Sequence, residues 1–324
     1  LLRHGFDEWK DLFNSRQLLC LSQLLKTIDE VENQNAKEYL LLAFGDSLRY
    51  NTQLTQYQYS RNHMGDLFST NAFDVPQEPA ENNVWGAEKG AGTFTAMYDM
   101  VLRGIKYGNS PTERYFESGE TKETPPFETS VGGEFEVNQG DARSLDFDEP
   151  FDIVLTDPPY YHNVIYSEIS NYFHTWMRQS LKNEYECFKP LSTPRAESIV
   201  SNPAEGKDAD VFEEELNQAF TSIRNHLKDD GLLIFTYHHS DSESWGELLT
   251  ALCDVNFQIT ATYPISADLS KHPTKIGSGD SVSFGIIIVA RPVDDTTPIS
   301  WNSLRRSIYR TAKATRRRLE TGDQ

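Results

Sequence analysis

The sequence has few cysteines, few positive charges and no long apolar run. Its 324 residues contain three cysteines, which are far apart in the chain and form no C-x-x-C pair: Cys20, Cys187 and Cys253. Neither a disulfide framework nor a zinc ribbon can be built from them, and a reducing, cytoplasmic setting fits. No run of about 18 apolar residues is present, so the chain is not expected to span a membrane.

The chain also lacks two features at its beginning. It starts Leu-Leu-Arg-His-Gly, without an initiator methionine and without the charged-then-apolar pattern of a signal peptide. We therefore expect it to have been cut from a longer protein. With 38% hydrophobic and 12% aromatic residues, it is apolar enough to fold rather than remain disordered.

Positive charge is scarce overall but concentrated at one end. The chain has 30 Lys and Arg against 49 Asp and Glu, a net charge of -19, which taken alone argues against a nucleic-acid partner. The last 24 residues carry seven basic and two acidic side chains, a net of +5, which leaves about -24 on the remaining 300. An acidic body is typical of a salt-adapted cytoplasm, where carboxylates keep proteins soluble, and this interpretation predicts that stability and activity rise in molar salt.

The basic residues of this tail follow a helical spacing. Arg306, Arg310, Lys313 and Arg317 fall three or four residues apart, which puts one basic stripe along a predicted helix. Such a stripe suits contact with phosphates. A solvated terminal helix explains the same spacing equally well, so both interpretations stay open.

Composition divides the chain into four parts. Helically spaced apolar residues and a polar, aromatic stretch predict a helical region with a polar arm over residues 1–108. Residues 109–133 are rich in Gly, Pro, Ser, Thr and Glu, and are predicted to be a linker. Residues 134–292 alternate between strand-like and helix-like segments and are predicted to form a sheet domain. The basic tail follows at residues 293–324.

The sheet domain is predicted to be α/β. Strands are expected at residues 134–139, 151–156, 232–237, 257–263 and 283–290, and helices at residues 167–181, 211–227 and 244–255. This alternation is typical of a doubly wound sheet. The last two strands have no evident helix between them and are expected to form an antiparallel pair at one edge. Lys228–Gly231 is predicted to be a turn before a buried strand.

Asp157-Pro158-Pro159-Tyr160 directly follows the predicted buried strand at residues 151–156. Ligands of open α/β sheets bind beyond the carboxyl ends of the strands, so chemistry is expected here. The Asp157 carboxylate and the Pro158 carbonyl can both accept hydrogen bonds from an exocyclic amine, and the prolines fix the backbone and remove N–H donors. Tyr160 offers a flat face for a base taken out of its stack. A rigid turn that ends a strand is the alternative interpretation.

Residues just beyond this tetrad are further candidates. Four of them are placed to line a base pocket, although packing on the following helix explains them equally well: Tyr161, His162, Asn163 and Tyr166. Tyr237-His238-His239 follows another strand at the same end of the sheet, where a structural hydrogen bond is the preferred interpretation over substrate contact. No further His, Cys or carboxylate stands at ligand spacing, so no metal site is expected.

These motifs resemble the amino-methyltransferases that use S-adenosylmethionine to modify adenine N6 or cytosine N4 in DNA. The tetrad is one motif of that family, and Gly140-Asp141-Ala142-Arg143-Ser144-Leu145 matches its strand-end acidic motif. Phe13–Leu19 and Tyr166–Trp176 are similar to the subgroup of large adenine-specific DNA methylases whose full chains carry a zinc ribbon. The likeness covers most of the chain, and the chain looks like the C-terminal part of such an enzyme.

The resemblance implies a Rossmann-like methyltransferase sheet over residues 134–292, with S-adenosylmethionine as cofactor and DNA as partner. It implies transfer to adenine N6 after base flipping, in a modification or phage-defence setting. The cofactor-binding residues that it implies are Gly140, Asp141, Ala142 and Asp157. The catalytic residues that it implies are Asp157, Pro158, Pro159 and Tyr160, and the residues that hold the base are Tyr160, Tyr161, Asn163 and Tyr166.

The glycine-rich loop of the cofactor site departs from the family pattern. Gly86–Phe94 has the glycines and a helix after it, but residues 79–85 make a poor strand and residues 108–133 supply no second one. The resemblance therefore implies that the true loop lies upstream, in a segment or partner chain that completes the cofactor site, while Gly86–Phe94 stays a second candidate. The competing hypothesis is a non-catalytic, nucleic-acid-binding part of a larger methylase. Methylation of RNA or of a protein glutamine ranks lower.

Overall fold

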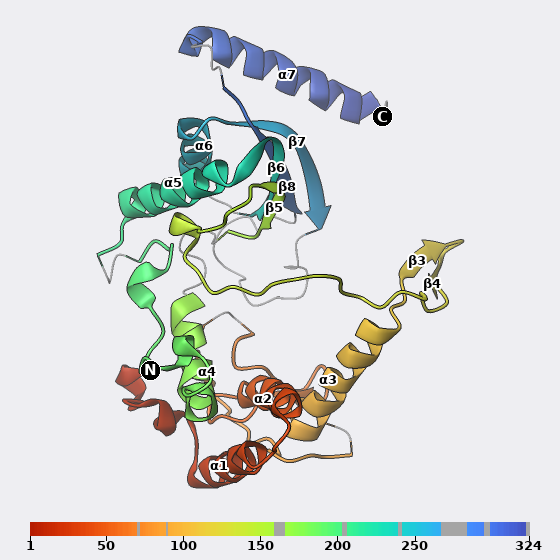
Figure 1. The fold of residues 1–324 in the computed structure, drawn as a ribbon, viewed down its shortest axis with the longest axis vertical. Helices are drawn as coiled ribbons and strands as arrows, with labels where there is room; N and C mark the ends of the chain where they lie inside the picture. Colours follow the sequence, from red (N-terminus) through yellow and green to blue (C-terminus); the bar gives the residue numbers. More distant parts are fainter. Residues whose placement is uncertain are drawn as a thin grey trace. The chain divides into compact units, whose positions relative to one another are not determined.

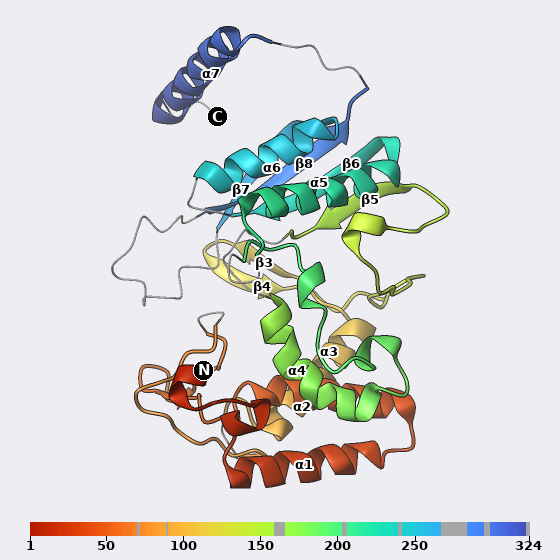
Figure 2. The ribbon, with the colours of Figure 1, turned by 90° about the vertical axis from the view of Figure 1, so that its left-hand side faces the viewer.

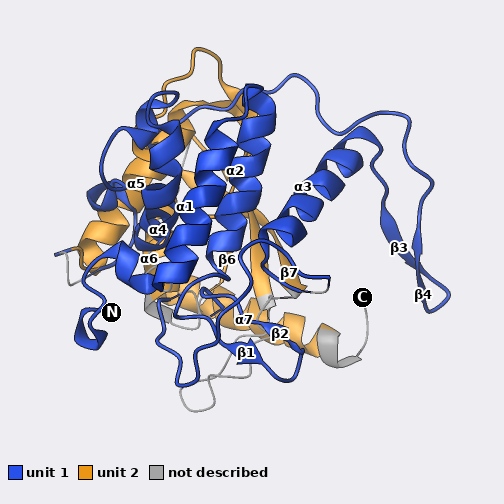
Figure 3. Ribbon diagram, turned by 90° about the horizontal axis from the view of Figure 1, so that it is seen from below, with its two compact units in different colours: residues 1–141, 161–206 blue, residues 142–160, 207–324 orange. Residues whose placement is uncertain are grey.

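The chain is α/β and divides into two compact units. The computed structural model describes residues 1–69, 72–88, 90–158, 166–202, 206–238, 242–266, 284–294 and 299–321. Unit 1 consists of residues 1–141 and 161–206, and unit 2 of residues 142–160 and 207–324 (Figure 3). This division cuts across the predicted domain at residues 134–292, because residues 161–206 group with the helical region. None of the helices in the described part of the chain is long and apolar enough to cross a membrane.

Unit 1 is built mainly from helices (Figure 1). Its α-helices are α1 (Ser15–Asp29), α2 (Gln34–Leu48), α3 (Phe94–Asn109) and α4 (Tyr166–Leu181). Its short 3-10 helices are η1 (Leu2–His4), η2 (Trp9–Leu12), η4 (Glu186–Phe188) and η5 (Arg195–Glu197). Two small antiparallel hairpins complete it, β1 (Tyr57–Gln58) with β2 (His63–Met64), and β3 (Arg114–Glu117) with β4 (Glu120–Glu123).

The start of α1 shows how the sequence sets a helix boundary. The Asn14 side chain accepts a hydrogen bond from the Gln17 amide at 2.8 Å, and the Gln17 side chain accepts one from the Asn14 amide at 2.9 Å. This reciprocal capping box satisfies amides that lack partners within the helix. Helix α1 therefore begins at Ser15, separate from the short helix η2 before it.

An aromatic cluster forms the core of unit 1. The ring of Trp176 on α4 lies 5.3 Å from Phe13 and 5.7 Å from Phe44, measured between ring centroids. Tyr172, one helical turn earlier, is buried and donates a hydrogen bond to the Leu48 carbonyl at 2.8 Å. Burial, together with the charge of Asp66, raises the pKa of Tyr172 well above its ordinary value. The helix that follows the tetrad is therefore fixed by packing against α1 and α2 of its own unit.

The segment between α3 and unit 2 differs from its sequence pattern in two places. Residues 114–123 of the predicted linker form the β3–β4 hairpin, in which Ser118 and Gly119 both have positive φ, as a tight two-residue turn requires. Residues 134–139, predicted to be a strand, are described and have no strand structure, and Phe135 and Val137 are 80% and 86% exposed. Alternation alone does not make a strand, because a strand needs a neighbouring strand and an apolar surface to cover.

Unit 2 contains a four-stranded mixed sheet with helices beside it. Its elements are η3 (Ala142–Ser144), β5 (Phe151–Thr156), α5 (Ala209–Asn225), β6 (Leu227–Tyr237), α6 (Ser242–Asp254), β7 (Phe257–Ser266), β8 (Phe284–Pro292) and α7 (Trp301–Thr321). The strand order is β5-β6-β8-β7, with β5 parallel to β6 and β8 antiparallel to both of its neighbours. The predicted antiparallel pair at one edge is confirmed as β7 and β8.

Helices α5 and α6 cover the same face of this sheet (Figure 2). Phe220 of α5 lies 5.8 Å from Phe235 of β6, and Trp245 of α6 lies 4.8 Å from Tyr237, two residues further along the strand. Residues two apart on a strand point to the same face, so both helices pack on the side of Leu233, Phe235 and Tyr237. All three of these side chains are buried.

Strand β5 is less covered than its sequence predicts. Ile153 and Leu155 are 55% and 75% exposed, although FDIVLT was expected to be a buried strand. Ile153 and Leu155 are in register with Leu232 and Ile234 of β6, so they point to the face of the sheet opposite to Leu233, Phe235 and α5. The turn predicted at Lys228–Gly231 is also wrong, because β6 runs through it with a shift of register between the pairs Phe151–Leu227 and Ile153–Leu232.

Candidate active site

Asp157 lies at the carboxyl end of the parallel pair β5 and β6. Thr156 is in register with Phe235, so Asp157 comes beside Thr236, and the Thr236 hydroxyl donates a hydrogen bond to the Asp157 carboxylate. Asp157 is exposed, whereas Pro158 is buried. The strand pairing thus fixes a carboxylate at the edge where ligands of α/β sheets bind.

The residues of β6 beyond Thr236 are anchored inside unit 2. Tyr237 is buried and its hydroxyl donates to the Ser244 carbonyl at 3.2 Å. His238, the next residue, is half-buried at the same edge of the sheet as Asp157. The interpretation of His238 as a structural residue stays a prediction, and His239 lies outside the described residues.

The other predicted site residues fall into two groups. Pro159, Tyr160, Tyr161, His162 and Asn163 lie outside the described residues. Tyr166 is the first residue of α4 and is exposed, in unit 1. Of the predicted residues around the amine site, the structure therefore describes Asp157 and Pro158 together in unit 2 and Tyr166 in unit 1.

The predicted acidic motif lies where the two units join along the chain. Gly140 is exposed and Asp141 half-buried at the end of unit 1, and Ala142 begins unit 2 and the helix η3. The motif was expected to follow a strand at residues 134–139, which the structure does not have. Just after it, the Leu145 amide donates to the Ser222 hydroxyl of α5 at 2.9 Å.

A cluster of charges holds η3 against α5. Glu215 of α5 accepts a hydrogen bond from Arg143 at 2.8 Å and lies 2.7 Å from the Lys207 ammonium group. The side chains of Arg143, Lys207 and Glu215 are 18%, 10% and 12% exposed, respectively. These three side chains are largely shielded from solvent, so their interaction is only weakly screened. The carboxylate that the two cations share therefore fixes the segment that begins at Ala142.

Replacing Glu215 with alanine is expected to lower the free energy of unfolding by about 3 kcal/mol, because Arg143 and Lys207 would stay buried without their shared carboxylate. Urea denaturation followed by circular dichroism measures this loss. Glu214→Ala is the matched control, since Glu214 precedes it on α5 and is exposed, and a change within about 0.5 kcal/mol is expected there. Equal losses in the two variants would contradict the role given to the cluster.

In the segment Gly86–Phe94, the second candidate for a cofactor loop, the amides at the start of α3 already donate hydrogen bonds within the protein. The first three backbone amides of α3 donate within this region, to the Val84 carbonyl, the Trp85 carbonyl and the Thr93 hydroxyl. Residues 80–85, all described, contain no strand. A helix N-terminus binds an anionic group through amides that lack partners. This arrangement therefore does not fit the carboxylate of a methionine group at the start of α3.

Packing also accounts for two of the glycines in this segment. Gly92 has φ of +74°, and a Cβ atom there would lie 2.1 Å from the Cβ of Tyr50. A Cβ at Gly86 would lie 2.5 Å from the Thr95 hydroxyl oxygen. Glycine is required at these positions because neighbouring side chains occupy the space. The fold of unit 1 therefore explains two of the three glycines in this pattern.

Polar residues in the Tyr166–Trp176 motif have structural contacts. The Asn171 side chain accepts a hydrogen bond from the Thr193 amide at 3.0 Å, and the His174 Nε2 atom lies 2.9 Å from the Pro190 carbonyl oxygen. Both side chains are buried. These residues hold the chain after η4 against α4, which gives the motif a role in folding.

Comparison with protein-family models, curated proteins and solved structures finds no match for this chain. What the chain does therefore has to be inferred from the residues around the carboxyl end of β5.

The sequence alone did not predict the contact between Thr236 and Asp157. Thr236 stands 79 positions from Asp157, and no spacing in the sequence links the two. A signal was present, however: Asp157 directly follows the predicted strand FDIVLT, and Thr236 is the polar residue next to the end of the predicted strand LLIFTY. Polar residues at the carboxyl ends of neighbouring strands in an α/β sheet come close together.

Proposed function

We propose that this chain transfers a methyl group from S-adenosylmethionine to an exocyclic amine of DNA, adenine N6, after the base has been flipped out. The observation that carries the proposal is the position of Asp157, directly after β5 at the carboxyl edge of the parallel pair, with its carboxylate hydrogen-bonded to Thr236. The β5–α5–β6 unit and the inserted antiparallel strand β8 are compatible with a Rossmann-like methyltransferase sheet. A modification or phage-defence setting in the cytoplasm belongs to the same proposal.

The described residues fit the half of such a site that holds the amine. The Asp157 carboxylate accepts one N–H of the amine, and the Pro158 carbonyl accepts the other. These two bonds draw the nitrogen lone pair out of conjugation with the ring and hold it in one direction, so that positioning supplies most of the rate. Tyr160 stacks against the flipped base in this proposal. S-adenosylmethionine, when bound, would supply an electrophilic methyl group: as the bond between the amine nitrogen and the methyl carbon forms, the bond from that carbon to sulfur would break, S-adenosylhomocysteine would leave and the amine would lose one proton.

The described residues do not fit the other half of such a site, the half that would hold the methionine group of the cofactor. The first three amides of α3 donate hydrogen bonds within unit 1, and packing accounts for Gly86 and Gly92. This observation favours a second candidate function, in which the chain is a non-catalytic nucleic-acid-binding part of a larger methylase. In that case an upstream segment or partner chain completes the cofactor site.

The two functions are separated by two measurements on the full chain. Isothermal titration with S-adenosylmethionine gives a single binding site if the chain is a complete enzyme, and no heat if it is a partial one. Incubation with duplex DNA and cofactor carrying a labelled methyl group, followed by mass spectrometry of the nucleosides, is expected to yield N6-methyladenine. Label in cytosine, in RNA or in protein, with none in adenine, would overturn the assignment.

Thr236→Val is expected to lower the rate constant of methyl transfer about tenfold, because the isosteric side chain cannot donate to the Asp157 carboxylate. Thr236→Ser keeps the hydroxyl and is expected to keep most of the rate. The measurement is steady-state kinetics with duplex DNA, in which the KM for DNA should stay unchanged while kcat falls. Equal rates for the valine and serine variants would show that Thr236 does not position Asp157.

A further inference from the structure

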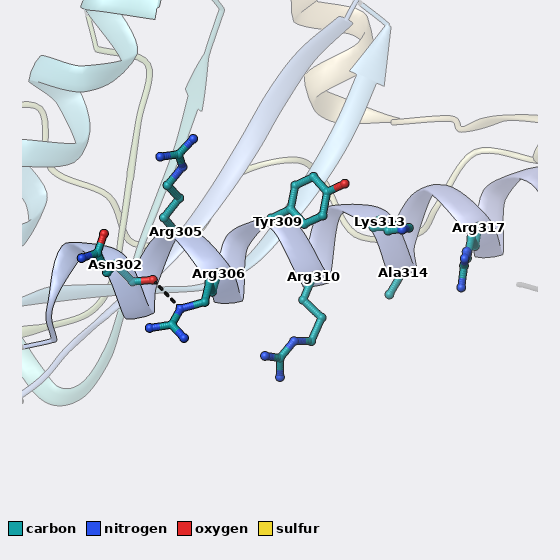
Figure 4. Close-up of a pocket in the computed structure, with 8 residues that line it drawn as sticks. All are labelled: Asn302, Arg305, Arg306, Tyr309, Arg310, Lys313, Ala314 and Arg317. Atoms are coloured by element: carbon teal, nitrogen blue, oxygen red, sulfur yellow. Dashed lines mark hydrogen bonds between the residues drawn. The ribbon is translucent and has the colours of Figure 1, made fainter.

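Helix α7 at the C-terminal end of unit 2 presents a dense basic surface. Every side chain from Trp301 to Arg318 is exposed, except Leu304, which is half-buried. A shallow, open hollow along the helix is lined mainly by six residues: Arg305, Arg306, Tyr309, Arg310, Lys313 and Arg317 (Figure 4). These six residues are called the α7 basic surface below.

The charge of α7 is opposite to that of the rest of the chain. The helix carries six arginines and one lysine against the single acid Glu320, a net of +6, within a protein of net charge -19. Figure 4 shows Arg306, Arg310 and Arg317 pointing to one side of the helix. From Arg306 to Arg317 the helix rises about 16 Å, and a duplex presents about nine phosphate charges over that length of its axis.

We propose that the α7 basic surface binds the phosphate backbone of duplex DNA. Arginine outnumbers lysine six to one in the helix, and the planar guanidinium group matches two phosphate oxygens at once, whereas an ammonium group acts as a point charge. Contacts of this kind position a protein on a duplex without reading its sequence. The proposal concerns a surface separate from Asp157 and stands without the proposed methyl transfer.

A membrane surface fits α7 less well than a duplex does. The large apolar side chains among those described, Trp301, Leu304, Ile308 and Tyr309, all lie in the first half of the helix. From Arg310 to Arg318 five of the nine residues are basic, and the apolar residues are alanines. An interfacial helix needs an apolar face along its length to enter the acyl region. Up to Arg318, the last side chain described, the second half of α7 has no such face.

A second copy of the chain is also a poor partner for this helix. Two α7 helices packed together would bring seven cations of one against seven of the other, and like charges at close range are destabilising. The partner has to be anionic. Regularly repeated phosphates match a row of arginines better than the scattered carboxylates of an acidic protein do.

The test is fluorescence anisotropy of a labelled 20-base-pair duplex (about two helical turns) titrated with the full-length chain, without cofactor, over a series of KCl concentrations. The variant carries Arg310→Ala, Lys313→Ala and Arg317→Ala, and alanine preserves the helix. Its matched control removes three exposed cations of unit 1, with Arg3→Ala, Lys26→Ala and Arg103→Ala. Circular dichroism and thermal unfolding establish that all the proteins are folded.

The α7 variant is expected to bind at least about tenfold more weakly at 0.1 M salt, and the slope of log K against log salt should fall in magnitude by about 2 to 3. The control variant should bind as the unmodified chain does. The titration contains no cofactor and reads only binding, so this proposal and the proposed catalysis can each fail alone.

Four results would overturn the proposal. These are no binding of the duplex by the unmodified chain, equal weakening in the control, binding of polyglutamate as tight as that of the duplex, and binding of phosphatidylserine vesicles without binding of the duplex.

Discussion

Replacing Asp157 with alanine is expected to lower the rate of methyl transfer to DNA by about a thousandfold or more. In the proposed site this carboxylate accepts an N–H of the target amine, and without it the lone pair of the nitrogen is neither freed nor directed. Asp157 is exposed at the end of β5, so the substitution should leave the stability of unit 2 nearly unchanged. The measurement is transfer of a labelled methyl group to duplex DNA at saturating cofactor.

Asp152→Ala is the matched control for this experiment. Asp152 lies on the same strand, its side chain is 81% exposed, and it pairs with Lys228 at 2.6 Å. The hydrogen bond to Asp152 raises the pKa of Lys228, and the pair lies at the opposite end of β5 from the tetrad. Loss of Asp152 should leave the rate within a factor of about two. Full transfer by Asp157→Ala, in a preparation whose parent chain is active, would show the mechanism to be wrong.

Asp157→Asn refines the same test. The amide oxygen can still accept a hydrogen bond, but it carries no negative charge and is a weaker acceptor. A rate between those of the parent and the alanine variant is expected. Such a result would show that both the geometry and the charge of the carboxylate contribute, whereas a rate equal to that of the alanine variant would assign the effect to charge.

Tyr172→Ala is expected to lower the free energy of unfolding of unit 1 by about 4 kcal/mol, the largest stability effect proposed for this protein. Tyr172 is buried among aromatic rings, with Phe13 stacked 6.1 Å away and Phe68 edge-on at 5.6 Å. Truncation removes the ring and leaves a cavity that these rigid neighbours cannot fill. Chemical denaturation followed by tryptophan fluorescence measures the loss, because Trp9 and Trp176 lie in the same cluster.

Tyr172→Phe separates the ring from its hydroxyl. This variant loses the hydrogen bond to the Leu48 carbonyl and is expected to cost about 1 to 2 kcal/mol. Burial raises the pKa of Tyr172, so the folded chain keeps a proton that the unfolded chain releases above its ordinary pKa of 10.0. The stability of the parent chain should therefore fall more steeply above pH 10 than that of the phenylalanine variant. Parallel curves for the two proteins, or equal losses for alanine and phenylalanine, would contradict this account.

Local patterns in the sequence predicted most of the elements and the position of the tetrad. The helices α4, α5 and α6 and the strands β5, β7 and β8 lie within a few residues of their predicted bounds. Apolar periodicity and capping residues such as Asn14 act over one or two turns, so the chain carries this information locally. The placement of Asp157 directly after a strand follows from the same kind of pattern.

Long-range pairing accounts for what the sequence did not predict. EFEVNQ alternates as a strand does, yet Phe135 and Val137 are exposed because the described chain gives them no partner strand. The glycines of Gly86–Phe94 suggested a ligand loop, whereas Tyr50, from a distant segment, explains Gly92 by steric exclusion. Neither outcome depends on the residues of the segment itself.

The sequence by itself determined that the chain is acidic and has a basic segment of helical spacing at its end. It also determined that an Asp-Pro-Pro-Tyr tetrad directly follows a strand of an α/β sheet. Only the tertiary structure decided that α4 packs with α1 and α2, and that Thr236 donates to Asp157. The physical reason is the register of β5 on β6. Which residues face each other across a parallel pair is set by the packing of whole strands and helices, and that packing is settled only when the chain has folded.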